Sequence, residues 1–130
     1  MARGTGLSCL ALLALLACAS ADETPTGPGP YIAAYILELD STVVGDSLVF
    51  LNPLGDRVPG NSPQHGFLVA FQMLSGDSMG ATAWLHATGP GSATLRASWE
   101  SNGRTHRRTA QVTADSAGPL VLTVPDFALP

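Results

Sequence analysis

Cysteine is nearly missing from this chain of 130 residues, which contains only Cys9 and Cys18. Both lie near the N-terminus, so the long remainder of the chain holds no pair that forms a disulfide bond. The part after Cys18 must therefore be held together by packing alone, even in a compartment that permits disulfides.

Lysine is absent as well, and six arginines face ten Asp and Glu, which gives a net charge of −4. General nucleic-acid binding needs a broad basic surface, so we expect no nucleic-acid partner. The one local concentration of positive charge is the segment 104–108, which contains Arg104, Arg107 and Arg108. We interpret it as a solvated turn; the alternative is a contact with lipid phosphate or with an acidic partner.

Long apolar runs are also lacking. The only one, Leu7 to Ala17, is too short for a membrane-spanning helix, which needs roughly 20 apolar residues. Arg3 precedes the run, and polarity returns at Ser20 and Asp22. A positive start followed by a short apolar run is the pattern of an export signal.

The end of this run, Leu15-Leu16-Ala17-Cys18, resembles the lipobox of bacterial lipoproteins. The resemblance implies that residues 1–17 are a signal peptide and that the Cys18 thiol is acylated. Several acyl chains on one cysteine imply stable anchoring in the membrane, and Ala19 implies delivery to the outer membrane where the host has one. We therefore expect a lipid-anchored protein of the cell membrane or outer membrane, with its domain outside the cytoplasm.

A second cleavage site competes with the lipobox. Ala19-Ser20-Ala21 has the small-x-small form of an ordinary signal-peptidase site, and cleavage there would release a soluble secreted or periplasmic chain beginning at Asp22. Residues 18–30 are rich in Pro and Gly and contain no large apolar side chain. This composition predicts a disordered tether rather than packed structure.

Residues 31–130 are long enough for one domain. They hold all eight aromatic residues of the chain, and apolar and polar residues alternate through them with the period of two that is typical of strands. Strands are expected at Tyr31–Leu39, Val43–Leu51, Gly66–Leu74, Ala81–Ala87, Ser92–Glu100, Arg104–Ala114 and Leu120–Val124. About seven short strands separated by Gly and Pro clusters predict an all-β antiparallel sandwich.

The clearest hairpin is formed by the strands on either side of Ser101-Asn102-Gly103. Asn and Gly accept the positive φ angles of a tight turn. The alternation places Trp99 on the apolar face of the first strand, and Ala110 and Val112 are expected to point inward from the second.

Three segments resemble the bacterial Ig-like domains of surface and adhesin-type proteins: Ser41–Phe50, Leu54–Gly60 and Gly89–Trp99. The resemblance implies an Ig-like sandwich with a structural, adhesion or protein-binding role. It also implies that the partner, if there is one, is an envelope or surface protein.

Two serines occur in patterns that esterases use. Gly45-Asp46-Ser47-Leu48 resembles the nucleophile block of the GDSL esterases, and Ser78 lies in a small-x-Ser-x-small pattern. A nucleophile elbow needs a helix after the serine, whereas strands are expected after Ser47 and Ser78. We therefore predict no enzyme, no catalytic residue and no cofactor; a small serine esterase is the alternative.

The three histidines, His65, His86 and His106, are about twenty residues apart, which is not the tight spacing of a local metal site. We expect no metal. A carbohydrate-binding surface is a further alternative, and it would need exposed aromatic rings. Trp84 shares a predicted outer face with Thr82 and His86, and Tyr31 or Tyr35 beside it on the surface would favour this alternative.

Overall fold

The structure is a computed structural model that describes residues 30–130. The predicted signal peptide, Cys18 and the predicted tether up to residue 29 lie outside the described residues. The described chain forms eight strands: β1 (Tyr31–Leu39), β2 (Val43–Leu51), β3 (Arg57–Pro59), β4 (Phe67–Met73), β5 (Ser78–Ala87), β6 (Gly91–Ser101), β7 (Arg104–Ala114) and β8 (Gly118–Ala128). Within residues 30–130 there is no helix long and apolar enough to cross a membrane.

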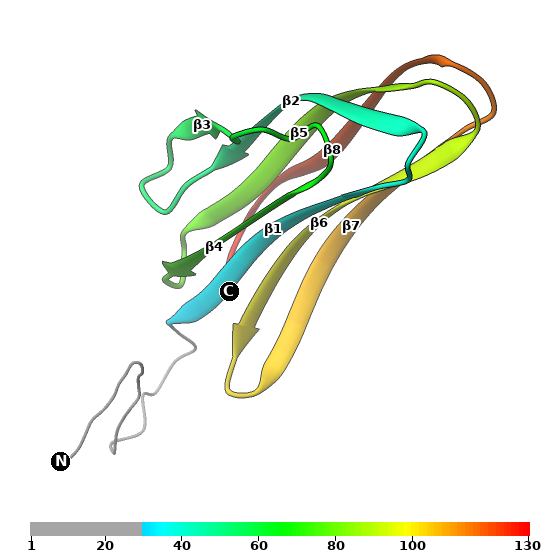
Figure 1. The fold of residues 1–130 in the computed structure, drawn as a ribbon. Coiled ribbons are helices and arrows are strands. Elements are labelled where there is room, and N and C mark those ends of the chain that lie inside the picture. The colour runs from blue at the N-terminus through cyan, green and yellow to red at the C-terminus, as the bar shows by residue number, and fades with distance from the viewer. Residues whose placement is uncertain (1–29) are drawn as a thin grey trace, which may run out of the picture.

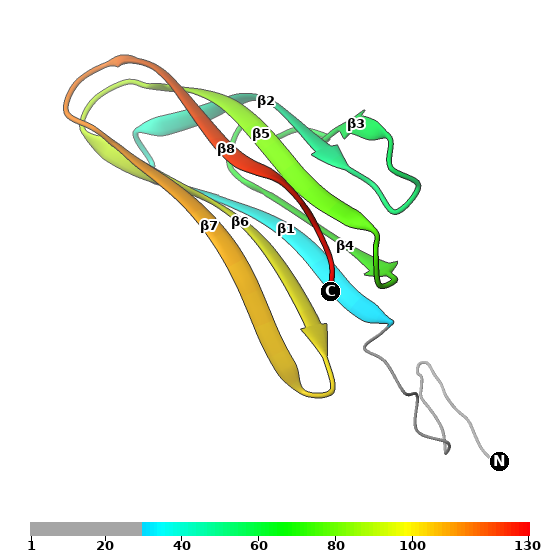
Figure 2. The ribbon, with the colours of Figure 1, turned by 180° about the vertical axis from the view of Figure 1, so that it is seen from behind.

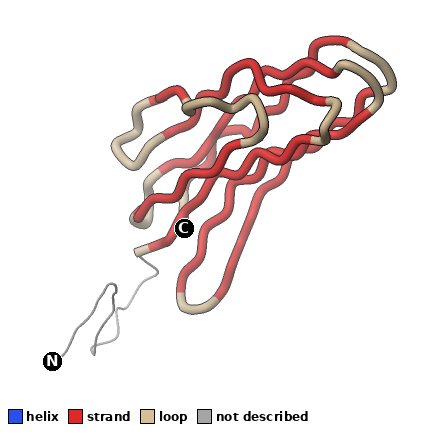
Figure 3. The backbone as a smooth tube through the Cα atoms, viewed as in Figure 1, coloured by secondary structure: helices blue, strands red, loops and turns tan. Residues whose placement is uncertain are grey.

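The strands form two antiparallel four-stranded sheets that pack face to face (Figure 1, Figure 2). One sheet has the order β4-β1-β6-β7 and the other the order β3-β2-β5-β8. The prediction of an all-β antiparallel sandwich is confirmed, and strand runs through most of the described chain (Figure 3).

Three strands differ from the sequence-based prediction. β5 begins at Ser78, three residues before the predicted Ala81. β3 was expected to be loop, because three residues are too few to show an alternating pattern, but it pairs with the end of β2. β8 extends at both ends beyond the predicted Leu120–Val124 and includes Pro119 and Pro125. Proline is tolerated there because β8 is an edge strand of its sheet. On the open side of an edge strand, a missing N–H costs no ladder hydrogen bond.

The core lies between the sheets and is built from the residues that face inward at alternate positions along the strands. β6 shows the pattern most clearly, since Ala93, Leu95, Ala97 and Trp99 are buried while the residues between them are not. The largest fully buried side chains are Tyr35, Leu48, Met73, Met79, Leu85 and Leu95. Burial of such apolar side chains, at about 1.5–3 kcal/mol each, is the main stabilising contribution in a domain without disulfides.

The β6–β7 hairpin has the predicted turn. Asn102 and Gly103 have φ angles of 55° and 75°, as a type I′ turn requires at both central positions. The register runs without a break from Ser101 opposite Arg104 to Gly91 opposite Ala114. Ala110 and Val112 pack against the core as expected.

One buried hydroxyl joins the two sheets. Tyr35 on β1 is fully buried; its Oη donates a hydrogen bond to the Leu51 carbonyl (2.8 Å) and accepts one from the Gly80 N–H (3.1 Å). The Gly80 N–H is available because the β5–β8 register shifts between Met79 and Ala81. Burial away from water raises the pKa of Tyr35 to about 12, since the phenolate would lose its hydration.

Both ends of the described chain meet at one end of the sandwich. The Tyr31 Oη donates a hydrogen bond to the Pro130 carbonyl (2.7 Å). The C-terminus therefore lies beside the start of β1 (Figure 1). The β1–β2, β5–β6 and β7–β8 connections lie at the opposite end, as the antiparallel registers require.

Candidate functional site

The predicted lipidation site, Cys18, lies outside the described residues. The described chain begins at Pro30, which is exposed and leads directly into β1. Because β1 is an inner strand of its sheet, the predicted tether would be attached to a strand that is paired on both sides.

The outer face of the β3-β2-β5-β8 sheet carries the exposed tryptophan. Trp84 on β5 is 42% exposed, and its strand partners are Ser47 on β2 and Val121 on β8. Val121 is 56% exposed, so the indole ring and an aliphatic side chain lie side by side in solvent. The prediction that Trp84 points outward is confirmed. We call Ser47, Thr82, Trp84, Val121 and Thr123 the Trp84 face.

Polar groups flank the tryptophan on this sheet. The Thr82 and Thr123 hydroxyl oxygens are 3.4 Å apart, and the His86 Nδ1 lies 2.8 Å from the Asp46 Oδ1. Asp46 reaches His86 because the β2–β5 register shifts between Gly45 and Ser47. A sheet surface with one aromatic ring among hydroxyls offers both a stacking surface and hydrogen-bonding groups.

The tyrosines do not extend this surface. Tyr31 and Tyr35 are buried and belong to the opposite sheet, and Trp99 is buried as predicted. The Trp84 face therefore has a single aromatic ring, and the cluster of exposed aromatics that would favour carbohydrate binding most strongly is not formed.

The two candidate serines both lie in strands. Ser47 is in the middle of β2 and Ser78 is the first residue of β5; each is followed by further strand residues, as predicted, and not by a helix. The His86–Asp46 pair lies near Ser47, but within residues 30–130 no hydrogen bond joins Ser47 to either member of the pair. Sequence reasoning missed this pair because its members are 40 positions apart and meet only through the β2–β5 register.

The three histidines have separate surroundings. His65 lies in the exposed loop before β4, His86 pairs with Asp46, and His106 stacks on Trp99 with ring centroids 5.6 Å apart. No group of three potential metal ligands is formed in the described part of the chain.

An aromatic and basic cluster covers the core beneath the β6–β7 hairpin. Trp99 packs between the His106 ring and Phe127, whose centroid is 5.0 Å away, and the Arg108 guanidinium lies 4.4 Å from the Phe127 centroid. Such a cation–π contact contributes about 0.5–1 kcal/mol at an exposed site. Arg108 therefore packs on a ring although it is exposed. Arg104 and Arg107 are exposed as well and make no ion pair with any residue in the range 30–130, so all three arginines are solvated as predicted.

Part of this cluster can be predicted from the sequence. Once the turn is placed at Asn102-Gly103, hairpin symmetry puts Trp99 opposite His106. Phe127 was missed because the predicted last strand stopped before Pro125.

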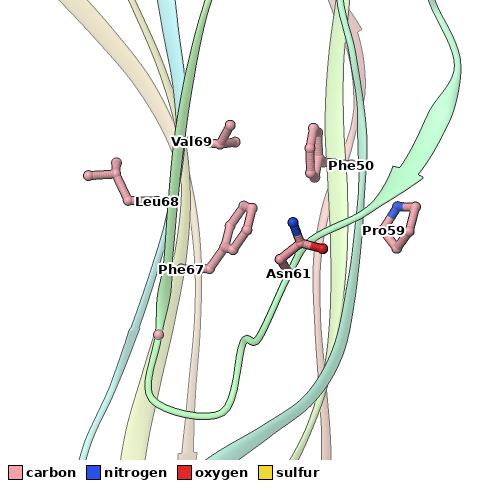
Figure 4. Close-up of a pocket in the computed structure, with 7 residues that line it drawn as sticks. Phe50, Pro59, Asn61, Phe67, Leu68 and Val69 are labelled. Carbon is pink, nitrogen blue, oxygen red and sulfur yellow. The ribbon is translucent and has the colours of Figure 1, made fainter.

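A pocket of about 410 Å³ opens between β3 and β4, the neighbouring edges of the two sheets (Figure 4). Phe67 and Val69 of β4 point toward Phe50 of β2, Leu68 points away, and Asn61 is the one polar side chain of its lining. The pocket exists because β3 covers only three residues of the sandwich side. Sequence analysis did not predict it, since it depends on which strands form neighbouring edges of the two sheets and on Pro59 and Asn61 of the expected loop.

No protein family, curated protein or solved structure matches this chain.

Proposed function

We propose that this protein is an exported, lipid-anchored protein of the cell envelope whose domain has a structural, adhesion or protein-binding role. The observation that carries the proposal is the sequence Leu15-Leu16-Ala17-Cys18 at the end of a short apolar run, followed by a Pro- and Gly-rich segment and then by a β-sandwich. The three segments that resemble bacterial Ig-like domains support the same class of role.

The arrangement of the sandwich is compatible with anchoring. A tether that enters at Tyr31 would place this end of the domain toward the membrane and the β1–β2, β5–β6 and β7–β8 connections away from it. Both sheets would then stand upright, with the Trp84 face accessible to a partner. A domain that acts by displaying a binding surface needs only that this surface is accessible and that the core is stable.

Replacing Cys18 by Ala is expected to move the protein from the membrane fraction to the soluble fraction or to leave it unprocessed, because no other thiol near the cleavage site accepts the lipid. The measurement is the intact mass and the N-terminal residue of the protein from each fraction of its host. The wild type should begin with an acylated Cys18. Cys9→Ala is the matched control and should change nothing, since Cys9 lies in the removed segment. An unmodified wild-type chain that begins at Asp22 in the soluble fraction contradicts the proposal.

Carbohydrate binding is a second candidate function, and the exposure of Trp84 is the observation that favours it. A sugar ring stacks on an indole face while hydroxyls such as those of Thr82 and Thr123 take part in hydrogen bonds. Insoluble peptidoglycan, a carbohydrate-containing polymer of bacterial envelopes, is the probe for this candidate.

Trp84→Ala is expected to weaken binding to insoluble peptidoglycan at least tenfold, which corresponds to about 1.4 kcal/mol, because it removes the stacking ring. Cosedimentation of the protein with the polymer is the measurement. Trp84→Phe keeps an aromatic ring and should retain most of the binding. Equal binding by the wild type and Trp84→Ala, or no binding by the wild type, contradicts this candidate.

A further inference from the structure

The sandwich has four open sheet edges, formed by β4, β7, β3 and β8. An open edge presents unpaired N–H and C=O groups, and natural sandwiches protect such edges with charge, proline, short strands or bulges. β3 has only three residues and ends in Pro59, and β8 contains Pro119 and Pro125. β7 carries three arginines. Three of the four edges are therefore protected by recognisable features.

β4 has none of these features. Its sequence FLVAFQM contains no charge, proline or glycine, and its register with β1 runs without a bulge from Met73 opposite Tyr31 to Phe67 opposite Leu37. Within the described chain, β4 pairs with β1 alone. The backbone N–H and C=O groups of every second residue of β4 therefore point to solvent. An uncharged seven-residue edge of this kind is a template for strand addition.

The side chains around β4 are also incompletely covered. On the outer face, Leu68 is 70% exposed and Ile32 on β1 is 59% exposed. On the inner face, Phe67, Val69 and Phe71 are only half-buried, and Phe67 and Val69 line the open pocket beside the short β3. A strand added to β4 would therefore cover apolar surface on both faces of the sheet.

We infer that the strand added to β4 is β4 of a second copy of this chain, which would make a dimer with one continuous eight-stranded sheet. The absence of charge makes the edge compatible with itself, since no like charges oppose each other across the contact. Ala70 is the central residue of β4. Its small outward-facing methyl group would let two copies of β4 pair around a two-fold axis that passes between their Ala70 residues. Leu68 of each copy then lies opposite Gln72 of the other, and Val69 opposite Phe71 of the other.

This pairing yields a reversible dimer. One strand pair buries less surface than the standard interface of about 1,600 Å², so the dimer fraction should rise with protein concentration. Antiparallel pairing places the two Ala70 Cα atoms about 4.5–5.5 Å apart, within the range that a disulfide bridges.

Cysteine cross-linking of the full-length protein in its own membranes tests the register. After mild oxidation, Ala70→Cys should run as a covalent dimer on a non-reducing gel. Leu68→Cys and Gln72→Cys should cross-link when co-expressed and much less when each is expressed alone. Thr109→Cys, at an exposed position on the opposite edge strand β7, is the matched control and should remain monomeric, and the wild type is the blank for the native cysteines. Equal dimer yields from Ala70→Cys and Thr109→Cys, or a cross-link from Ala70→Cys to a different protein, would overturn the inference.

Sedimentation velocity of the detergent-purified protein gives a second, independent measurement. The wild type should change from monomer to dimer as its concentration rises, and Ala70→Lys should stay monomeric at every concentration because it places two ammonium groups at the axis. Thr109→Lys should dimerise like the wild type, and circular dichroism should show unchanged strand content in both variants. A wild type that is monomeric at its highest soluble concentration would contradict the proposed dimer.

Discussion

Tyr35→Phe is expected to lower the free energy of unfolding by about 2–4 kcal/mol, although it removes a single oxygen atom. The Tyr35 hydroxyl satisfies two backbone groups of the opposite sheet, the Leu51 carbonyl and the Gly80 N–H. The substitution leaves both groups without their partner in the core, and an unsatisfied buried group costs about 1–3 kcal/mol. Urea denaturation with an unchanged m-value would show that the loss arises in the folded state.

Tyr31→Phe is the matched control. It also removes a hydroxyl hydrogen bond, but the Pro130 carbonyl that accepts this bond lies at the exposed C-terminal residue, where water can replace the hydroxyl. We expect a loss of about 0.5–1.5 kcal/mol from this variant. Equal losses in the two variants would show that Tyr35 does not act as a link between the sheets.

The same residue predicts how stability changes in alkali. Burial raises the pKa of Tyr35 from 10 to about 12 in the folded state, so its contribution is complete below pH 10 and is lost as the pH rises toward 12. The loss amounts to about 3 kcal/mol. It should be present in the wild type and missing from Tyr35→Phe when unfolding is measured from pH 8 to pH 12. Parallel pH curves for the two proteins would contradict this assignment.

Gly45→Ala is expected to lower the free energy of unfolding by about 2–3 kcal/mol, at the upper end of the usual cost of overpacking. A Cβ atom at Gly45 would lie 2.1 Å from the Pro63 carbonyl oxygen and 2.8 Å from its carbon. Both are backbone atoms, so no side-chain rotation relieves the clash. The loop would have to move away from β2, and the Gly45 N–H would lose its 3.2 Å hydrogen bond to the Gln64 carbonyl.

Gly89→Ala provides the comparison, because a Cβ atom there meets nothing within 4 Å. Its effect on the unfolding free energy should stay within about 0.5 kcal/mol. Thermal denaturation of the two variants side by side is sufficient. A Gly45→Ala protein as stable as Gly89→Ala would mean that the loop 60–66 is not held against β2 as the structure has it.

Local patterning was sufficient to predict most strands. β6 and β7 alternate cleanly and are joined by an Asn-Gly turn, so their positions, their pairing and the inward direction of Trp99 follow from nearby residues alone. The outward direction of Trp84 followed in the same way from its neighbours in β5. These features depend on short-range periodicity, which a single sequence displays.

Features that depend on distant pairing were not predictable. The order of strands within the sheets decides that β8 is an edge that tolerates proline, that β3 covers little of the sandwich side, and that β4 is left open. The same holds for Asp46 and His86, and for the two bonds of the Tyr35 hydroxyl, whose partners are 16 and 45 positions away. No local pattern encodes such distances along the chain.

The hydrogen bond between Tyr31 and Pro130 holds both ends of the described chain at one pole of the sandwich, and the β7–β8 connection lies at the other pole. A reporter joined after Pro130 would emerge at the pole where the chain enters β1, beside the β6–β7 hairpin, and would crowd whatever precedes that strand. A reporter inserted between Asp115 and Ser116, in the exposed β7–β8 connection, would stand at the other pole. The choice of insertion point therefore determines which end of the molecule a label reports on.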